Sequence, residues 1–172
     1  MTAAGVSAYQ DAVTGNTGIA CFDHWVGELT TAGYLHNHAR MWFASIWVFT
    51  LRLPWTLGAE LFLDHLLDGD PASNTLSWRW VAGLHTQGKN YLARAANIAR
   101  YTRGRFDPRG QLDERAEPLP ADGWGQSRVD LTVPKPPDPG AKSVLLVHPD
   151  DLTPEHSPLR RMPFSAVIGL GD

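Results

Sequence analysis

Apolar residues recur at helical spacing through residues 17–83. In the clearest stretch, His36, Arg40, Phe43 and Trp47 are separated by four, three and four residues, so they share one face of a helix. No alternating pattern typical of a strand precedes residue 105, which makes this part of the chain all-α. The pattern predicts helices over residues 17–31, 36–51, 57–67 and 72–81.

Glycine and proline mark the ends of these predicted helices. Residues 15–18 read Gly-Asn-Thr-Gly and form a turn, after which Asn16 or Thr17 is the expected helix cap. Gly33 ends the first helix. Pro54 ends the second, because a residue that precedes proline avoids helical dihedrals.

The pattern changes beyond the helical region. Residues 107–141 are rich in proline and have little periodic apolar content, which indicates an extended linker. The run at 143–148, Ser-Val-Leu-Leu-Val-His, is strand-like, and it either begins a further domain or adds to the sheet edge of a partner. The sequence from Pro149 onward is loop-like. We therefore predict a multi-helix, all-α domain over 1–106 and a mostly irregular tail over 107–172.

Charge and composition exclude several classes of protein. Residues 1–106 hold eight Lys/Arg and seven Asp/Glu, and residues 107–172 hold seven and eleven. Neither part resembles a basic clamp for nucleic acid, so strong non-specific DNA binding is not predicted. Cys21 is the only cysteine, which excludes an internal disulfide. The longest apolar stretch, 41–51, is too short to cross a bilayer, so we expect a soluble, cytoplasmic protein with no membrane partner.

Two carboxylates flank a glycine at the end of the third predicted helix. They form the string Asp68–Gly69–Asp70, and Asn74 follows four residues later. A glycine allows close approach to the backbone, and the amide adds a donor and an acceptor. A helix-ending turn with a capping aspartate explains the same residues, whereas a calcium loop is disfavoured because the oxygen-rich series stops at Asn74. Arg40 needs a counter-ion if it is buried, and Asp68 is the expected one.

Histidine and tryptophan supply the remaining candidates. His36 and His38 lie on different helix faces with no cysteine or nearby carboxylate to complete a ligand set, so no metal site is predicted. Six of the seven tryptophans fall within the first 80 residues. Trp78 and Trp80 point to different sides of a helix, which allows one to face the core and the other a cavity. Two tryptophans packed in the core explain the same pattern.

These features occur in one order and at one spacing. The strings are Gly15-Asn-Thr-Gly-Ile, Phe22-Asp23, Gly33-Tyr-Leu-His-Asn-His-Ala-Arg-Met41, Phe62-Leu-Asp-His-Leu-Leu-Asp-Gly-Asp-Pro-Ala-Ser-Asn74, Ser77-Trp-Arg-Trp80, Thr86-Gln-Gly-Lys89 and Gly104-Arg-Phe-Asp107. The combination closely resembles the FAD-binding domain of the photolyase/cryptochrome family over about residues 14–108.

The resemblance implies an all-helical domain that holds FAD in a U-shaped conformation. Arg40 and Asp68 would form an ion pair beside the isoalloxazine ring, which agrees with the pairing expected above. Asp70 would bind the polar edge of the ring, and Asn74 would face its N5 atom. The implied cofactor-binding residues are Asn37, Arg40, Asp68, Gly69, Asp70 and Asn74.

The resemblance also implies roles in catalysis. Trp78 would be the flavin-proximal member of an electron-transfer chain and Trp55 the middle member, while Asn74 tunes the flavin. In that family, photoexcited reduced flavin donates an electron to a pyrimidine dimer in DNA, and the dimer splits.

The implied DNA-binding residues are Asn37, His38, Met41 and Trp80. Asn37, Met41 and Trp80 match positions that line the cavity for a flipped dimer. His38 stands where repair enzymes commonly have arginine, and histidine is more often neutral at pH 7.

Three interpretations remain open. The chain is part of a photolyase-type lyase, a cryptochrome-like flavin photosensor or redox module, or an inactive relic that needs a partner. The family's antenna domain and its upstream FAD-domain helices are not found in this sequence, so a separately encoded N-terminal half is an expected partner. We also expect the isolated chain to bind FAD weakly.

Overall fold

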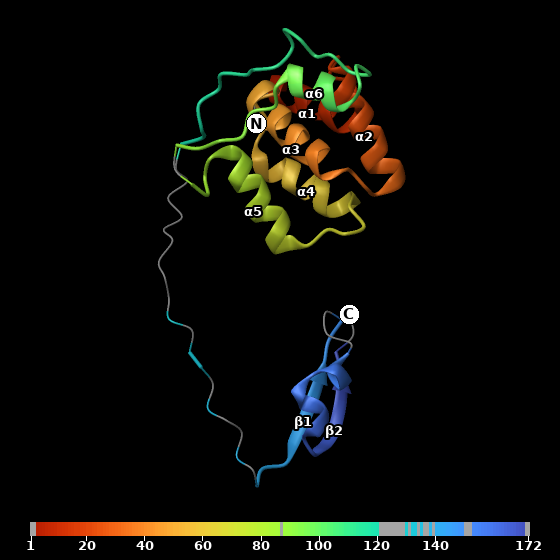
Figure 1. The fold of residues 1–172 in the computed structure, drawn as a ribbon, viewed down its shortest axis with the longest axis vertical. Coiled ribbons are helices and arrows are strands. Elements are labelled where there is room, and N and C mark those ends of the chain that lie inside the picture. The colour runs from red at the N-terminus through yellow and green to blue at the C-terminus, as the bar shows by residue number, and fades with distance from the viewer. Residues whose placement is uncertain are drawn as a thin grey trace. The chain divides into compact units, whose positions relative to one another are not determined.

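The computed structural model describes residues 3–86, 88–120, 130, 132–133, 135, 138, 140–149 and 153–170. The chain divides into two compact units, residues 1–125 and 126–172. In its described part, the first unit is built from α1 (Ala3–Thr14), α2 (Ala20–Ala32), α3 (Asn37–Ser45), the π-helical turn η1 (Ile46–Thr50), α4 (Trp55–His65), α5 (Pro71–Ala82) and α6 (Ala95–Tyr101) (Figure 1). None of the described helices has both the length and the apolar character needed to cross a bilayer.

The helix α2 starts differently from the prediction. It begins after Ile19, whose side chain makes no capping hydrogen bond, so the expected cap at Asn16 or Thr17 is wrong. Instead, the side chain of Asp23, in the first turn of the helix, extends back toward the preceding loop. Its carboxylate accepts hydrogen bonds from the Thr17 backbone and hydroxyl, at 2.9 and 2.6 Å, and from the Gly18 N–H at 3.0 Å. An acidic side chain there satisfies free N–H groups and suits the positive end of the helix dipole.

The core forms where the predicted apolar face of α3 and η1 meets α2, α4 and α5. Phe22, Phe43, Trp47 and Trp78 are among its largest wholly buried side chains. Trp47 donates its indole N–H to the carbonyl of Pro54, 2.9 Å away, which satisfies the one polar group of this side chain. Pro54 lies directly before α4 and so separates η1 from it, as the sequence predicted.

Two of the described α-helices, α1 and α6, were not predicted from the sequence. On α1, Ala12 is buried while Tyr9 and Val13 are only partly buried, so its apolar stripe is narrow. The helix α6 has seven residues, which is shorter than the window over which helical periodicity can be recognised. Both helices are stabilised mainly by packing on the core rather than by their own sequence.

The helical unit also continues beyond residue 106, where the sequence placed its end. Leu112, Ala116 and Leu119 pack against the core, and the Leu119 N–H donates to the carbonyl of Ala82 at 3.0 Å. Isolated apolar residues anchor this irregular segment, so it shows no periodicity in the sequence.

The second unit corrects the prediction of an all-α chain with an irregular tail. The expected strand at 143–148 is confirmed as β1 (Ser143–Val147), but it pairs in parallel with β2 (Phe164–Gly169). The connection carries two short 3₁₀ helices, η2 (Pro154–His156) and η3 (Pro158–Arg161). Parallel strands need such a crossover, and a pairing between segments this far apart leaves no local pattern.

We predict that Gly58→Ala lowers the free energy of unfolding by about 1–3 kcal/mol, the usual cost of overpacking a core. An added Cβ at Gly58 would lie 2.6 Å from Trp78 Cζ3 and 3.0 Å from Trp47 Cε2. Urea denaturation followed by circular dichroism measures the change.

The matched control is Gly27→Ala in α2, where an added Cβ has no neighbour within 4 Å. There the alanine should raise stability by up to about 1 kcal/mol through helix propensity. Equal effects of the two substitutions would contradict the packing argument.

Candidate functional site

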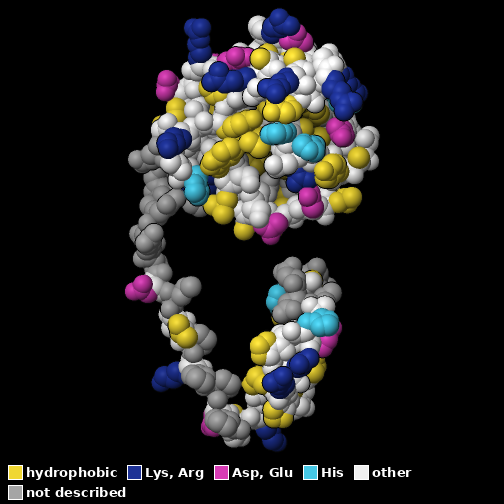
Figure 2. Space-filling view, viewed as in Figure 1, with side chains coloured by type: hydrophobic (Ala, Val, Ile, Leu, Met, Phe, Trp, Pro, Cys, Tyr) yellow, Lys and Arg dark blue, Asp and Glu magenta, His cyan; other side chains and the backbone are white. Residues whose placement is uncertain are grey.

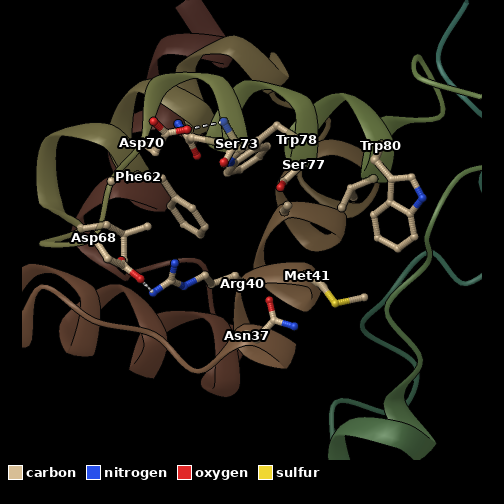
Figure 3. Close-up of a pocket in the computed structure, with 15 residues that line it drawn as sticks. Asn37, Arg40, Met41, Phe62, Asp68, Asp70, Ser73, Ser77, Trp78 and Trp80 are labelled. Carbon is tan, nitrogen blue, oxygen red and sulfur yellow. Dashed lines mark hydrogen bonds and ion pairs between the residues drawn. The ribbon is translucent and has the colours of Figure 1, made fainter. Parts of the chain in front are cut away.

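A cavity of about 320 Å³ opens between α3, the end of α4 and α5 (Figure 3). One wall comes from α3, a second from α4 and the loop after it, and the third from α5. The lining residues are Asn37, Arg40, Met41, Ala44, Phe62, Leu66, Asp68, Gly69, Asp70, Ser73, Asn74, Ser77, Trp78, Trp80 and Val81.

One face of α5 supplies much of this lining. Ser73, Asn74, Ser77, Trp78 and Val81 follow one another at helical spacing and turn toward the same space. Sequence reasoning identified Asn74 and Trp78 but missed both serines and Val81 as lining residues. Ser77 and Val81 lie three and seven residues after Asn74, on the same face of a helix, and this spacing is the signal that could have identified them.

The charged edge of the cavity is the ion pair between α3 and the loop after α4. Nη2 of Arg40 lies 2.9 and 3.0 Å from the two carboxylate oxygens of Asp68, and its Nε donates to the Leu35 carbonyl at 2.8 Å. The predicted ion pair is therefore confirmed. The side chains are 24% and 59% exposed, and pairs this exposed contribute about 0–1 kcal/mol to stability. Its main effect is to hold one guanidinium in one orientation.

Asp70 caps α5. Its carboxylate accepts the backbone N–H of Ser73 at 2.7 Å, and hydrogen bonds from Ser73 hold the pKa of Asp70 below its ordinary value. The interpretation as a capping aspartate is thus confirmed, and the same carboxylate also lines the cavity. Gly69 suits this tight turn, because an added Cβ would lie 3.0 Å from the Leu66 carbonyl oxygen, closer than most Cβ contacts.

Asn74 of α5 contributes an amide group to the lining of the cavity. Its Nδ2 donates to the carbonyl of Ala59 at 2.7 Å, which fixes the amide against α4. Among the described residues, no group donates a hydrogen bond to its Oδ1. The amide oxygen is therefore available to accept an N–H from a molecule in the cavity.

The two tryptophans of α5 differ in burial, but both line the cavity, so the expected division into one core side chain and one cavity side chain is only half right. Trp78 is 2% exposed, its ring packs edge-on to Phe62 with centroids 5.1 Å apart, and its buried Nε1 has no acceptor among the described residues. Trp80 is 41% exposed and stacks on Tyr91 at 5.5 Å. In the close-up Trp80 lies on the same side of the cavity as Met41 (Figure 3).

Two of the predicted residues lie outside the lining. His38 stacks on Trp42, with centroids 5.4 Å apart and planes 11° from parallel, and also contacts Tyr101. Trp55 is partly buried at the start of α4, with the guanidinium carbon of Arg79 5.8 Å from its ring centroid. The cavity collects the other predicted residues, namely Asn37, Arg40, Met41, Asp68, Gly69, Asp70, Asn74, Trp78 and Trp80.

The remaining chemistry of the helical unit is limited. Within the described residues there is no group of three or more His, Cys, Asp or Glu that could hold a metal ion. Burial raises the pKa of the Cys21 thiol to about 11, so it stays protonated at neutral pH.

On the face seen in Figure 2, Lys and Arg side chains lie singly or in small groups with acidic side chains among them. Gln87, part of the Thr86–Lys89 string, lies outside the described residues.

Residues 3–115 match the family described as the FAD-binding domain of DNA photolyase. The chain belongs to this family. It is 36% identical over 135 residues to a deoxyribodipyrimidine photo-lyase of Streptomyces griseus, an alignment that covers 72% of this chain and 29% of that protein. It is 34% identical over 112 residues to cryptochrome-1 of Arabidopsis thaliana, covering 63% and 16%. The photo-lyase of Escherichia coli K12 is 36% identical over 77 residues, covering 45% and 16%. The chain thus spans less than a third of the length of these relatives.

The cavity fits the ring end of the FAD that the family implies. It combines an indole N–H on Trp78 and an amide oxygen on Asn74, neither with a partner among the described residues, with the charges of Arg40 and Asp68 and the apolar side chain of Phe62. Pockets for small molecules enclose about 300–1,000 Å³, and this cavity is at the lower end. It therefore has room for a flat ring system rather than for the whole dinucleotide.

The lowered pKa of Asp70 predicts a pH dependence of stability. A carboxyl whose pKa is lower in the folded state stabilises the protein above its unfolded pKa, and this stabilisation is lost as the pH falls through the lowered value. Asp70→Asn retains a capping side chain that does not titrate. We expect its stability to fall less steeply than that of the wild type between neutral and acidic pH, measured by urea denaturation. Parallel curves for the two proteins would refute the assignment.

Proposed function

We propose that this chain binds the isoalloxazine ring of FAD in the cavity and takes part in light-driven electron transfer of the photolyase type, splitting pyrimidine dimers in DNA. The observation that supports this most directly is the meeting of Arg40, Asp68, Asn74 and Trp78 at one cavity. The family membership and the similarity to a deoxyribodipyrimidine photo-lyase support the reaction class.

Each lining group has a defined part in the proposal. Bound flavin supplies the light absorption and the one-electron chemistry. Arg40, held by Asp68, provides positive charge that favours an electron-rich ring. Asn74 Oδ1 accepts a ring N–H, and Asp70 accepts at the polar edge. The apolar side chain of Phe62 helps to exclude water from the ring.

Electron transfer and substrate binding use the remaining predicted residues. Trp78 lies in the cavity wall and is the proposed first donor, with Trp55 as the next member of that chain. Asn37, Met41 and Trp80 are proposed to receive a flipped dimer, because they line the same cavity and Trp80 presents an exposed aromatic surface.

DNA and a further polypeptide segment are the proposed partners. The cavity accommodates the ring, so we infer that residues beyond its lining hold the pyrophosphate and adenine. A separately encoded N-terminal half would supply them. His38 stacks on Trp42 outside the cavity, which favours weak contact with the backbone of DNA and leaves a cryptochrome-like photosensor as the second candidate.

If the cavity holds only the isoalloxazine ring, which we call the ring-only fit, different flavins should bind the chain with similar affinities. Riboflavin, FMN and FAD should bind the purified protein with similar, weak affinity, because the phosphates and adenine find no partners in the cavity. Fluorescence titration with each flavin measures this. Much tighter binding of FAD than of riboflavin would contradict the ring-only fit, and Asn74→Leu should weaken all three equally.

Repair is tested with the chain saturated with reduced flavin and illuminated in the presence of an oligonucleotide that contains a thymine dimer. We expect a light-dependent loss of dimers, measured by chromatography, and a smaller loss with Trp80→Ala. If dimers persist while flavin is bound, repair by this chain is excluded and the photosensor remains.

A further inference from the structure

A second aromatic path leaves Trp78 on the side away from the cavity. The Trp78 ring meets Trp47 edge-on, with centroids 6.3 Å apart and planes at 83°. Trp47 in turn meets Tyr9 of α1 edge-on, with centroids 6.0 Å apart and planes at 89°. Trp47 is 0% exposed, whereas Tyr9 is only partly buried. Three rings in contact therefore connect the cavity wall with the surface.

The packing around these rings keeps them together. Gly58 of α4 lies where the two indoles meet, and an added Cβ there would crowd both Trp78 and Trp47. The hydrogen bond from Trp47 Nε1 to the Pro54 carbonyl fixes the orientation of the middle ring. Among the described residues, the rings that contact Trp78 are those of Phe43, Trp47 and Phe62, and of these three only the indole of Trp47 is readily oxidised.

The three rings differ in whether they can lose a proton when they are oxidised. The buried Trp78 Nε1 has no acceptor among the described residues, and Trp47 donates to a backbone carbonyl, which is a very weak base. An oxidised indole at either place keeps its proton and so readily takes an electron from the next ring. Tyr9 is only partly buried, so an oxidised phenol there can release its proton to water.

We propose that Trp47 and Tyr9 form an electron-transfer branch from Trp78, with Tyr9 as the terminal donor. The inference rests on the proposed function for its trigger, a photoexcited oxidised isoalloxazine that accepts one electron. Trp78 gives that electron and is refilled from Trp47, which is refilled from Tyr9. The net change is one electron gained by the ring system, and one electron and the phenolic proton lost by Tyr9. The product at Tyr9 is a neutral tyrosyl radical.

The branch is tested first without flavin. A brief ultraviolet flash photoionises indoles in the full chain, and transient absorption then follows the decay of tryptophanyl radical and the growth of tyrosyl radical. We expect Tyr9→Phe to lose one kinetic component of that growth. Trp47→Phe should lose the same component, and the double variant should lose no more than either single one. The component should also be slower in D₂O, because a proton leaves Tyr9.

Tyr91 provides the matched control, because it is the tyrosine stacked on the other cavity tryptophan, Trp80. Tyr91→Phe should leave the Tyr9 component unchanged. Tyr9→Phe removes a single hydroxyl from a partly buried side chain, so the thermal unfolding of this variant should match that of the wild type. The loss of the tyrosyl component can therefore be tested even if the Trp47→Phe variant does not fold. An unchanged tyrosyl growth in Tyr9→Phe, or a loss only in Tyr91→Phe, would overturn the branch.

A second measurement separates the branch from the proposed function. The chain is saturated with riboflavin and illuminated with blue light, and electron paramagnetic resonance detects the radicals. We expect a tyrosyl signal that Tyr9→Phe removes and Trp55→Phe retains. A signal removed by Trp55→Phe and retained in Tyr9→Phe would overturn the branch. If ultraviolet light drives the Tyr9 component and blue light produces no radical, the branch stands and the flavin function fails.

Discussion

The close approach of α4 and α5 at Gly58 determines most of what the helical unit can do. Because Gly58 has no side chain, the indole of Trp78 packs directly over α4 and meets Trp47 behind it. This contact closes one wall of the cavity, and it also buries the side chain that would exchange electrons with a ligand. A larger residue at this place would separate the ring that lines the site from the core that positions it.

The polar part of the site is built on this packed wall but contributes little to holding the fold together. The ion pair of Arg40 and Asp68 is partly exposed, so its value lies in orienting charge rather than in stabilising the protein. The carboxylate of Asp70 caps the start of α5, and the amide of Asn74 donates a hydrogen bond to α4. Both side chains are thereby fixed before any ligand arrives, which is the preorganisation that binding and electron transfer favour.

The sequence predicted most of the features that depend on neighbouring residues and missed several that depend on residues far apart in the chain. The helices at 36–51, 57–67 and 72–81 were recognisable because their apolar positions repeat over several turns, and the capping of α5 by Asp70 lies within one turn. The start of α2 was misplaced because Asp23 acts backward from inside the helix. The strand β2 was missed because it becomes a strand only by pairing with β1 across a crossover.

The amino-acid sequence alone fixes which chemical groups are present and how they are spaced, as from Asp70 at the cap of α5 through Asn74 to Trp78, because that spacing depends only on helical geometry. It also carried the family resemblance that the comparisons confirm. Only the tertiary structure decided which helices face each other across the cavity, that Trp55 and His38 lie outside its lining, and that Trp78 meets Trp47 and then Tyr9. Tyr9 and Trp78 are far apart in the chain, and only the packing of a shared core brings such residues together.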